Sequence, residues 1–233
     1  MHRRNFSRLA LAGVSGLLMW PANGTAASPT QGTVRGKVTV SKRRGKRKPK
    51  PKRTHSGVVV YLEGVAEARL PKPTVPHEIT QKNQQFEPAV SVVVVGTKIS
   101  FPNDDRIYHN VYSLSDVLEF DLGQYKAGTT KIIKVSKPGH MEVYCNIHPG
   151  MRATVLVLDT TFYAETDPDG TFVINNVPPG TYTYVAWQPD GSPVRGEVVV
   201  VAGGENVLDI PVVEDPRAPR QLDKHGKPHG RYK

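Results

Sequence analysis

The chain has 233 residues, which is enough for one large domain or two small ones, and its formal net charge at pH 7 is +10. Abundant glycine (21 residues) and proline (20 residues), with short apolar stretches rich in valine and threonine, predict an all-β protein with many turns. The single cysteine excludes an internal disulfide bond.

Residues 1–27 have the pattern of an export signal. Arg3 and Arg4 precede an apolar run at 9–20, and small residues typical of a cleavage site follow. The paired arginines followed by Phe6 favour the twin-arginine type, and an ordinary secretory signal is the alternative. We therefore expect a periplasmic protein. No other segment is apolar enough to span a bilayer.

Positive charge is concentrated in two segments outside the signal. The run 42–53 carries nine positive charges and is too charged to bury, so it predicts a solvated loop between the strands of a hairpin formed by 33–40 and 57–63. The tail, 215–233, is polar and is expected to be disordered. The signal holds three positive charges and the tail from Pro216 a net five. Subtracting these and the nine charges of the run from the total of +10 leaves the remaining body with a net charge of −7.

The middle of the chain predicts a series of short strands. They are expected at 89–95, 97–101, around His109, and at 130–135, 141–145 and 153–158. Strand alternation places Met141, Val143 and Cys145 on one face, and His109 and Val111 on one face of their own strand. His109 and Cys145 can therefore both point into the interior of one sandwich.

A third stretch, 160–213, predicts further short antiparallel strands. Asp-rich turns that contain Gly170 and Gly180 separate these strands. Asp167 and Asp169 could hold calcium, but we favour a hairpin turn at this position.

Four side chains form a candidate metal site. Cys145, His148 and Met151 share one short loop, and His109 lies upstream. One thiolate, two imidazoles and one thioether are the soft ligand set of an electron-transfer copper site. A zinc site would favour a carboxylate or a second thiolate over Met151. Taken singly, each residue has a structural alternative, namely an inert buried thiol, a polar strand histidine or a packing methionine.

The sequence lacks the motifs of further redox centres. It has no His-x-His pair, which the additional centres of multicopper oxidases and nitrite reductases need, and no Cys-x-x-Cys-His haem motif. Because the four ligands would leave no open position on the metal, we expect no enzymatic activity.

The ligand pattern resembles the cupredoxins, with amicyanin and plastocyanin as the most similar members. The resemblance rests on the Cys-x-x-His-x-x-Met loop, the upstream His-Asn-Val and the Phe-Pro-Asn-Asp-Asp at 101–105, and it covers 75–159. It implies a Greek-key β-sandwich that binds one type 1 copper ion. It also implies electron passage through the edge of the His148 ring. The implied ligands are His109, Cys145, His148 and Met151, with Asn110 hydrogen-bonding near the cysteine loop.

A second resemblance concerns the flanking segments. The Asp-x-Asp-Gly-x-Phe and Val-Pro-Pro-Gly-x-Tyr motifs resemble carboxypeptidase-regulatory-like, transthyretin-like domains. This implies a second small β-sandwich made of 31–68 and 160–214, with the cupredoxin inserted into it. In the alternative, the early strands simply extend the cupredoxin.

Together these features predict a periplasmic blue copper protein that carries single electrons between protein redox partners, such as a periplasmic dehydrogenase or a cytochrome. The alternative is a non-redox copper-binding module, or a structural module that binds the cell envelope or carbohydrate. The basic loop 42–53 is expected to contact an acidic partner or the anionic envelope surface in a salt-dependent manner. No nucleic-acid partner is expected, because aromatic residues are not interleaved with the basic ones.

Overall fold

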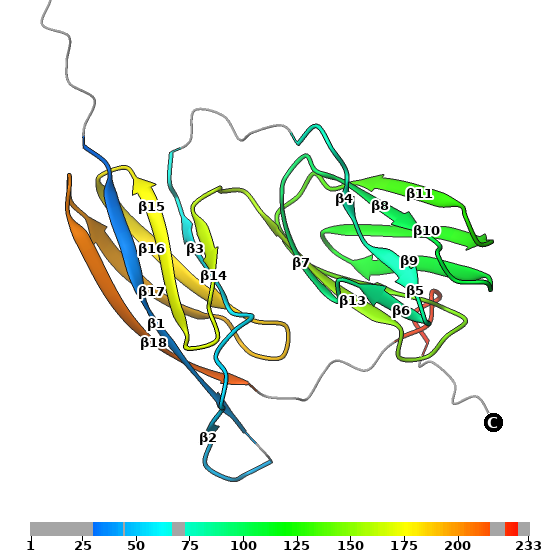
Figure 1. The fold of residues 1–233 in the computed structure, drawn as a ribbon, viewed down its shortest axis with the longest axis horizontal. Coiled ribbons are helices and arrows are strands. Elements are labelled where there is room, and N and C mark those ends of the chain that lie inside the picture. Colours follow the sequence, from blue (N-terminus) through cyan, green and yellow to red (C-terminus); the bar gives the residue numbers. More distant parts are fainter. Residues whose placement is uncertain (1–29, 44, 67–72, 215–221, 228–233) are drawn as a thin grey trace, which may run out of the picture.

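The computed structural model describes residues 30–43, 45–66, 73–214 and 222–227, so the predicted export signal lies outside the described residues. This part of the chain forms eighteen strands and no helix, which confirms the all-β prediction (Figure 1). Within the same residues no helix could cross a membrane. The strands build two β-sandwiches.

One sandwich combines strands from the two ends of the described chain. Its first sheet places β1 (Gly32–Lys42) between β15 (Thr171–Val177) and β18 (Glu205–Glu214), with β2 (Lys50–Pro51) paired to the end of β1. Its second sheet has the order β14 (Tyr163–Glu165), β3 (Val59–Glu63), β16 (Gly180–Trp187) and β17 (Val194–Val200). β1 and β3 thus pair with strands that follow residue 158.

The predicted hairpin of 33–40 with 57–63 is wrong, because β1 and β3 lie in opposite sheets. Both edges of β1 are occupied, by β15 in antiparallel and by β18 in parallel orientation. Gly36 permits the close approach of β18, since a Cβ atom there would lie 2.1 Å from the carbonyl oxygen of Leu208. The basic run turns back on itself instead, through the pairs Ser41–Pro51 and Lys42–Lys50.

A turn is present at 167–170, as favoured over a calcium site, but it is not a hairpin turn, because the strands on either side of it, β14 and β15, lie in opposite sheets. The backbone N–H of Gly170 donates to the carbonyl oxygen of Asp167, and Gly170 has a φ of +89°, which glycine adopts without strain. Oδ1 of Asp169 accepts hydrogen bonds from the backbone N–H and the hydroxyl of Thr171. The two carboxylates therefore belong to a turn that the chain itself stabilises.

The other sandwich is built from residues 77–158 (Figure 1). Its larger sheet has the order β10 (Leu118–Tyr125), β9 (His109–Ser115), β12 (Gly139–Tyr144), β13 (Arg152–Leu158) and β7 (Val90–Val94). Facing it are β11 (Thr130–Lys134), β8 (Lys98–Pro102) and β4 (His77–Glu78), and a small hairpin joins β5 (Thr80–Lys82) to β6 (Gln85–Glu87). The core between these sheets includes Cys145 and Met151.

The two sandwiches meet through an apolar cluster. Leu156 and Leu158 of β13 pack with Val59 of β3 and Trp187 of β16, and all four are at most 5% exposed. The strand β13 is therefore covered on both faces, by its own core on one side and by the neighbouring sandwich on the other. Because β13 pairs with β12, this covering also restrains the strand that leads into Cys145.

Candidate metal centre

Three donor atoms converge at one end of the larger sheet. His109 begins β9, Cys145 directly follows β12, and His148 lies in the loop before β13. The Cys145 Sγ lies 3.8 Å from Nδ1 of His109 and 3.6 Å from Nδ1 of His148, and the two nitrogens are 3.0 Å apart. The antiparallel pair Tyr144–Tyr112 joins β12 to β9 and holds these ends together.

The cysteine loop closes on itself through its backbone. The N–H of Cys145 donates to the carbonyl oxygen of Met151 at 3.1 Å, and the N–H of Met151 donates to that of His148 at 3.2 Å. Gly150 makes the turn with a φ of +85°. The Met151 side chain is 2% exposed and belongs to the same apolar cluster as Cys145. The loop thus returns Met151 to the neighbourhood of the thiol.

Burial differs among the three donors. His109 and Cys145 are fully buried, whereas His148 is only partly so. Burial lowers the pKa of His148 below its ordinary value, and the neighbouring His109 lowers it further, although Asp105 acts in the opposite direction. His148 is therefore held as a neutral imidazole, the form that binds metal ions.

Asp105 contacts the centre from the side opposite to the thiol. Its Oδ2 lies 2.7 Å from Nε2 of His109, and its two oxygens also accept hydrogen bonds from the backbone N–H groups of Asn83 and Gln84. Burial raises the pKa of Asp105, but the hydrogen bonds from Gln84, His109 and Asn83 outweigh this and hold it below the ordinary value. An ionised carboxylate that accepts a hydrogen bond from Nε2–H leaves the lone pair of His109 Nδ1 directed at Cys145.

Asp105 is a functional residue that the sequence alone did not single out. Asp105 ends the Phe-Pro-Asn-Asp-Asp segment that carried part of the cupredoxin resemblance, and it lies four residues before His109. That spacing was the available signal. However, the positioning of Asp105 depends on the β5–β6 turn, which is remote in the sequence.

Asn110 belongs to a chain of hydrogen bonds beside the centre. Its Nδ2 donates to Oδ1 of Asp121 at 2.7 Å, and Oδ2 of Asp121 lies 2.8 Å from Nζ of Lys224. The backbone N–H of Lys224 in turn donates to Oδ1 of Asn146, the residue after the cysteine, at 3.1 Å. Asn110 and the cysteine loop thus share a connection through the C-terminal segment.

That segment departs from the prediction of a disordered tail. Residues 222–227 lie against the sandwich, where the hydroxyl of Tyr112 donates to the carbonyl oxygen of Leu222 at 2.5 Å. A turn at 223–226 is closed by the backbone N–H of Gly226 on the carbonyl oxygen of Asp223. The prediction is therefore wrong for 222–227, since polar contacts to Tyr112, Asp121 and Asn146 order a segment that lacks apolar residues of its own beyond Leu222.

A comparison with known families bears on the sandwich that contains β1 and β3. Residues 148–213 match the family model of the carboxypeptidase regulatory-like domain. This confirms the resemblance seen in the Asp-Gly and Pro-Gly motifs. The carboxypeptidase regulatory-like match begins inside the cysteine loop and includes β13, which pairs with β12 and β7 of the other sandwich. The strands β14 to β17 and most of β18 that it also covers belong to the sandwich completed by β1 and β3.

Several solved structures are similar to part of the chain. A purple cupredoxin from Nitrosopumilus maritimus is 22% identical, covering 35% of this chain and 99% of its own, with a TM-score of 0.33. A Cu(I) amicyanin mutant is 19% identical, covering 42% and 98%, with a TM-score of 0.34. A Cu-containing nitrite reductase from Thermus scotoductus is 23% identical, covering 41% of this chain and 25% of that chain, with a TM-score of 0.36. No curated protein matches the chain.

Proposed function

We propose that this protein binds one type 1 copper ion through His109, Cys145, His148 and Met151 and carries single electrons. The observation that supports this most is the convergence of one buried thiol and two imidazole nitrogens, whose donor atoms all lie within 4.8 Å of one another. A thiol and two imidazoles suit copper in both of its oxidation states, and a weak thioether is the usual fourth donor of such sites.

The residues present fit that metal. Each histidine offers Nδ1 to the common centre. In His109 the other ring nitrogen, Nε2, is hydrogen-bonded to Asp105. The Cys145 thiol would bind as the thiolate, which requires loss of its proton on metal binding. When bound, copper would supply a one-electron couple and nothing else would be required of it. The residues would supply a fixed geometry and limited access of water.

The surrounding structure supports electron carriage because it limits rearrangement. His109 and Cys145 are fully buried and lie at the ends of two paired strands, and β13, which pairs with β12, is covered on both faces. A closely packed interior resists displacement of its side chains. Ligands held in this way would move little between the two oxidation states, which favours fast electron transfer. With four protein ligands and no open position, we propose a carrier and no catalysis.

His148 is the proposed point of electron entry and exit, since it is the only one of the four proposed ligands that is not buried. Protein redox partners, such as a periplasmic dehydrogenase or a cytochrome, would dock at this edge. The periplasmic location is proposed from the predicted export signal, whose twin-arginine pattern also fits a copper protein exported after folding. We further propose that 31–68 and 160–214 form one discontinuous domain that supports the cupredoxin-like segment 75–159.

The test is the addition of Cu(II) to the purified mature protein. We expect an intense visible absorption band from thiolate-to-copper charge transfer, which Cys145→Ser abolishes. His77→Gln is the matched control, because His77 is bonded to Ser91 and lies outside the ligand cluster. A colourless copper adduct would refute the proposed centre. A coloured protein without a reversible one-electron wave in voltammetry would favour the non-redox binding module instead.

A further inference from the structure

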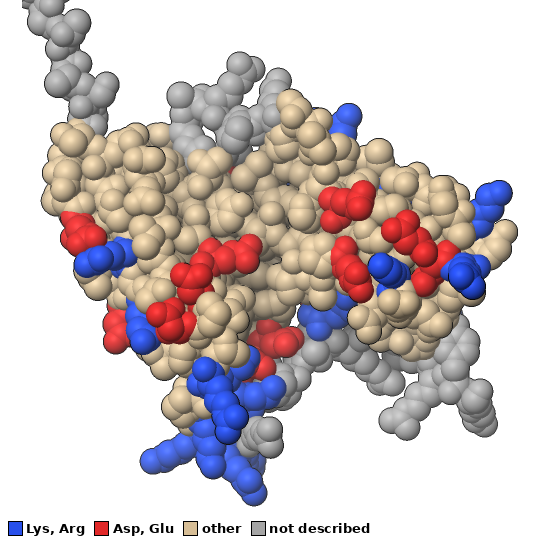
Figure 2. All heavy atoms as spheres, viewed as in Figure 1, with Lys and Arg blue, Asp and Glu red and all other residues tan. Residues whose placement is uncertain are grey.

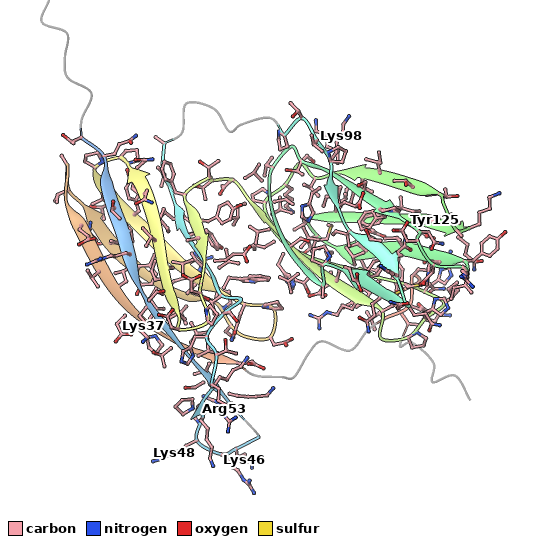
Figure 3. The ribbon with its side chains drawn as sticks, viewed as in Figure 1. Lys37, Lys46, Lys48, Arg53, Lys98 and Tyr125 are labelled. Carbon is pink, nitrogen blue, oxygen red and sulfur yellow. The ribbon has the colours of Figure 1, made fainter. Side chains whose placement is uncertain are left out.

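The basic hairpin projects from the molecule as a separate finger. It comprises the end of β1, the following loop and β2, and Figure 1 shows it extending beyond both sandwiches. Lysine and arginine side chains cover it in Figure 2, and Lys46, Lys48 and Arg53 point outward from it in Figure 3. The run 42–53 contains no acidic residue. This finger is therefore a concentrated positive charge held away from the acidic body.

Two of its lysines are fixed at the base. Lys42 and Lys52 lie 3.0 and 2.7 Å from the carboxylate of Glu214, which ends β18 and is 7% exposed. Burial raises the pKa of Glu214, but hydrogen bonds from Lys52 and Lys42 outweigh it and hold the pKa below its ordinary value. The ionised carboxylate thus anchors both sides of the hairpin. Its charge is shared between these two lysines.

Among the described residues, the remaining cations of the finger have no ion-pair partner. They are Arg43, Lys46, Arg47, Lys48, Lys50 and Arg53. Moreover, Lys42 and Lys50 are direct cross-strand neighbours, an arrangement of like charges that destabilises a hairpin. The proline on each side of Lys50 restricts the backbone and keeps this strand extended. Glu214 offsets this repulsion only on the Lys42 side, and a bound anion would relieve the rest.

Three of these unpaired cations, together with the two lysines that contact Glu214, line a hollow of about 300 Å³. Its walls are Lys42, Arg47, Lys48, Lys50, Pro51 and Lys52. Five of these six residues are cationic, and the guanidinium of Arg47 can offer a bidentate fork to a phosphate. The run has no aromatic residue, so it provides neither a platform for stacking bases nor an apolar wedge for a bilayer. Recognition at this hollow must rest on charge and hydrogen bonding.

We propose that this hollow binds phosphate groups, carried either by a soluble polyphosphate or by the headgroup of an acidic phospholipid. The proposal is independent of the electron-transfer function. Tyr125, which pairs with His109 in the sheet, lies in the other sandwich, well away from the finger in Figure 3. A phosphate ligand at the finger would therefore leave the metal centre accessible to redox partners.

The test uses the full mature protein at low salt. Calorimetric titration with inorganic diphosphate measures the soluble arm, and flotation with phosphatidylcholine vesicles, with and without phosphatidylglycerol, measures the lipid arm. The variant Arg47→Gln/Lys48→Gln/Lys50→Gln should weaken binding about a hundredfold, since each basic residue near an anionic surface contributes about fivefold. The control Lys98→Gln/Lys126→Gln/Lys134→Gln removes the same charge from exposed positions of the other sandwich and should bind normally.

The outcomes separate the sources of phosphate and test the proposal itself. Diphosphate binding without vesicle binding identifies a soluble ligand, whereas vesicle binding that diphosphate displaces identifies a lipid headgroup. Binding of neither diphosphate nor the phosphatidylglycerol vesicles would overturn the proposal. Equal binding of polyglutamate would do so as well, because the finger would then recognise any acidic chain. An equal loss in the control variant would attribute the binding to net charge and also overturn it.

Discussion

Oδ2 of Asp105 lies 2.7 Å from Nε2 of His109, so a carboxylate is hydrogen-bonded to the far side of a proposed metal ligand. Such a contact fixes which ring nitrogen carries the proton and increases the basicity of the other. The carboxylate is itself held by two backbone N–H groups of the β5–β6 turn. The small hairpin therefore acts on the proposed metal centre through Asp105.

Replacing this carboxylate with an amide tests that relationship. Asp105→Asn keeps the shape of the side chain but removes its charge, so His109 becomes a weaker electron donor. We expect Cu(II) affinity to fall by about tenfold to a hundredfold. We also expect the reduction potential to rise, since a less basic imidazole stabilises Cu(II) less than Cu(I). Competition with a chelator and voltammetry measure the two effects.

Asp104→Asn is the control for this experiment, because Asp104 is exposed and adjacent to Asp105 in the sequence. It should leave both quantities unchanged. An unaltered potential in Asp105→Asn would show that the contact merely fills space beside the ring.

A change at Met151 tests the proposed fourth ligand. Met151→Leu keeps the apolar volume that this 2%-exposed side chain fills but removes the thioether sulfur. We expect the protein to remain folded and coloured, because the thiolate that gives the colour is retained. The potential should rise, since loss of a weak axial donor favours the reduced ion. A spectrum and a potential equal to those of the unmodified protein would exclude Met151 as a ligand.

The donor cluster could be predicted from the sequence because its causes are local. His148 follows Cys145 in one loop, and strand alternation directs Cys145 and His109 inward. Asp105 could not be assigned, because backbone groups of Asn83 and Gln84, remote in the sequence, hold its carboxylate. The same limit applied to β1. The pairing of residue 34 with residue 206 depends on the complete fold, and adjacency in the chain wrongly favoured a hairpin with β3.

The ion pair of Glu142 and Arg152 should contribute to stability where the two sandwiches meet. Nε and Nη2 of Arg152 lie 2.5 and 2.8 Å from the two oxygens of Glu142, which also accept from Thr154. Glu142→Gln leaves Arg152 without its carboxylate and should lower the free energy of unfolding by about 2 kcal/mol at neutral pH. Urea denaturation measures this loss. Glu119→Gln, at an exposed position of β10, should have little effect.

The same carboxylate should make stability depend on pH. Burial raises the pKa of Glu142, but hydrogen bonds from His140 and Arg152 outweigh it and hold the pKa below the ordinary value of 4.5. A folded-state pKa below that of the unfolded chain gives stability that is fully present above about pH 4.5 and is lost as the pH falls through the lower value. Urea denaturation across this range should show a shallower decline for Glu142→Gln than for the unmodified protein. Parallel declines would contradict the assignment.

Removal of the C-terminal segment should loosen the cysteine loop. Truncation after residue 221 deletes the backbone donor of Lys224 to Asn146 and the acceptor of the Tyr112 hydroxyl at Leu222. The exposed ion pair of Lys224 with Asp121 contributes little by itself, about 0.2–1 kcal/mol. The main effect should therefore be local, seen as faster amide hydrogen exchange in 145–151 with little change in global stability. Truncation after residue 227 retains these contacts and should leave exchange unchanged. Equal protection in both truncated proteins would show that the segment rests on the sandwich without restraining the loop.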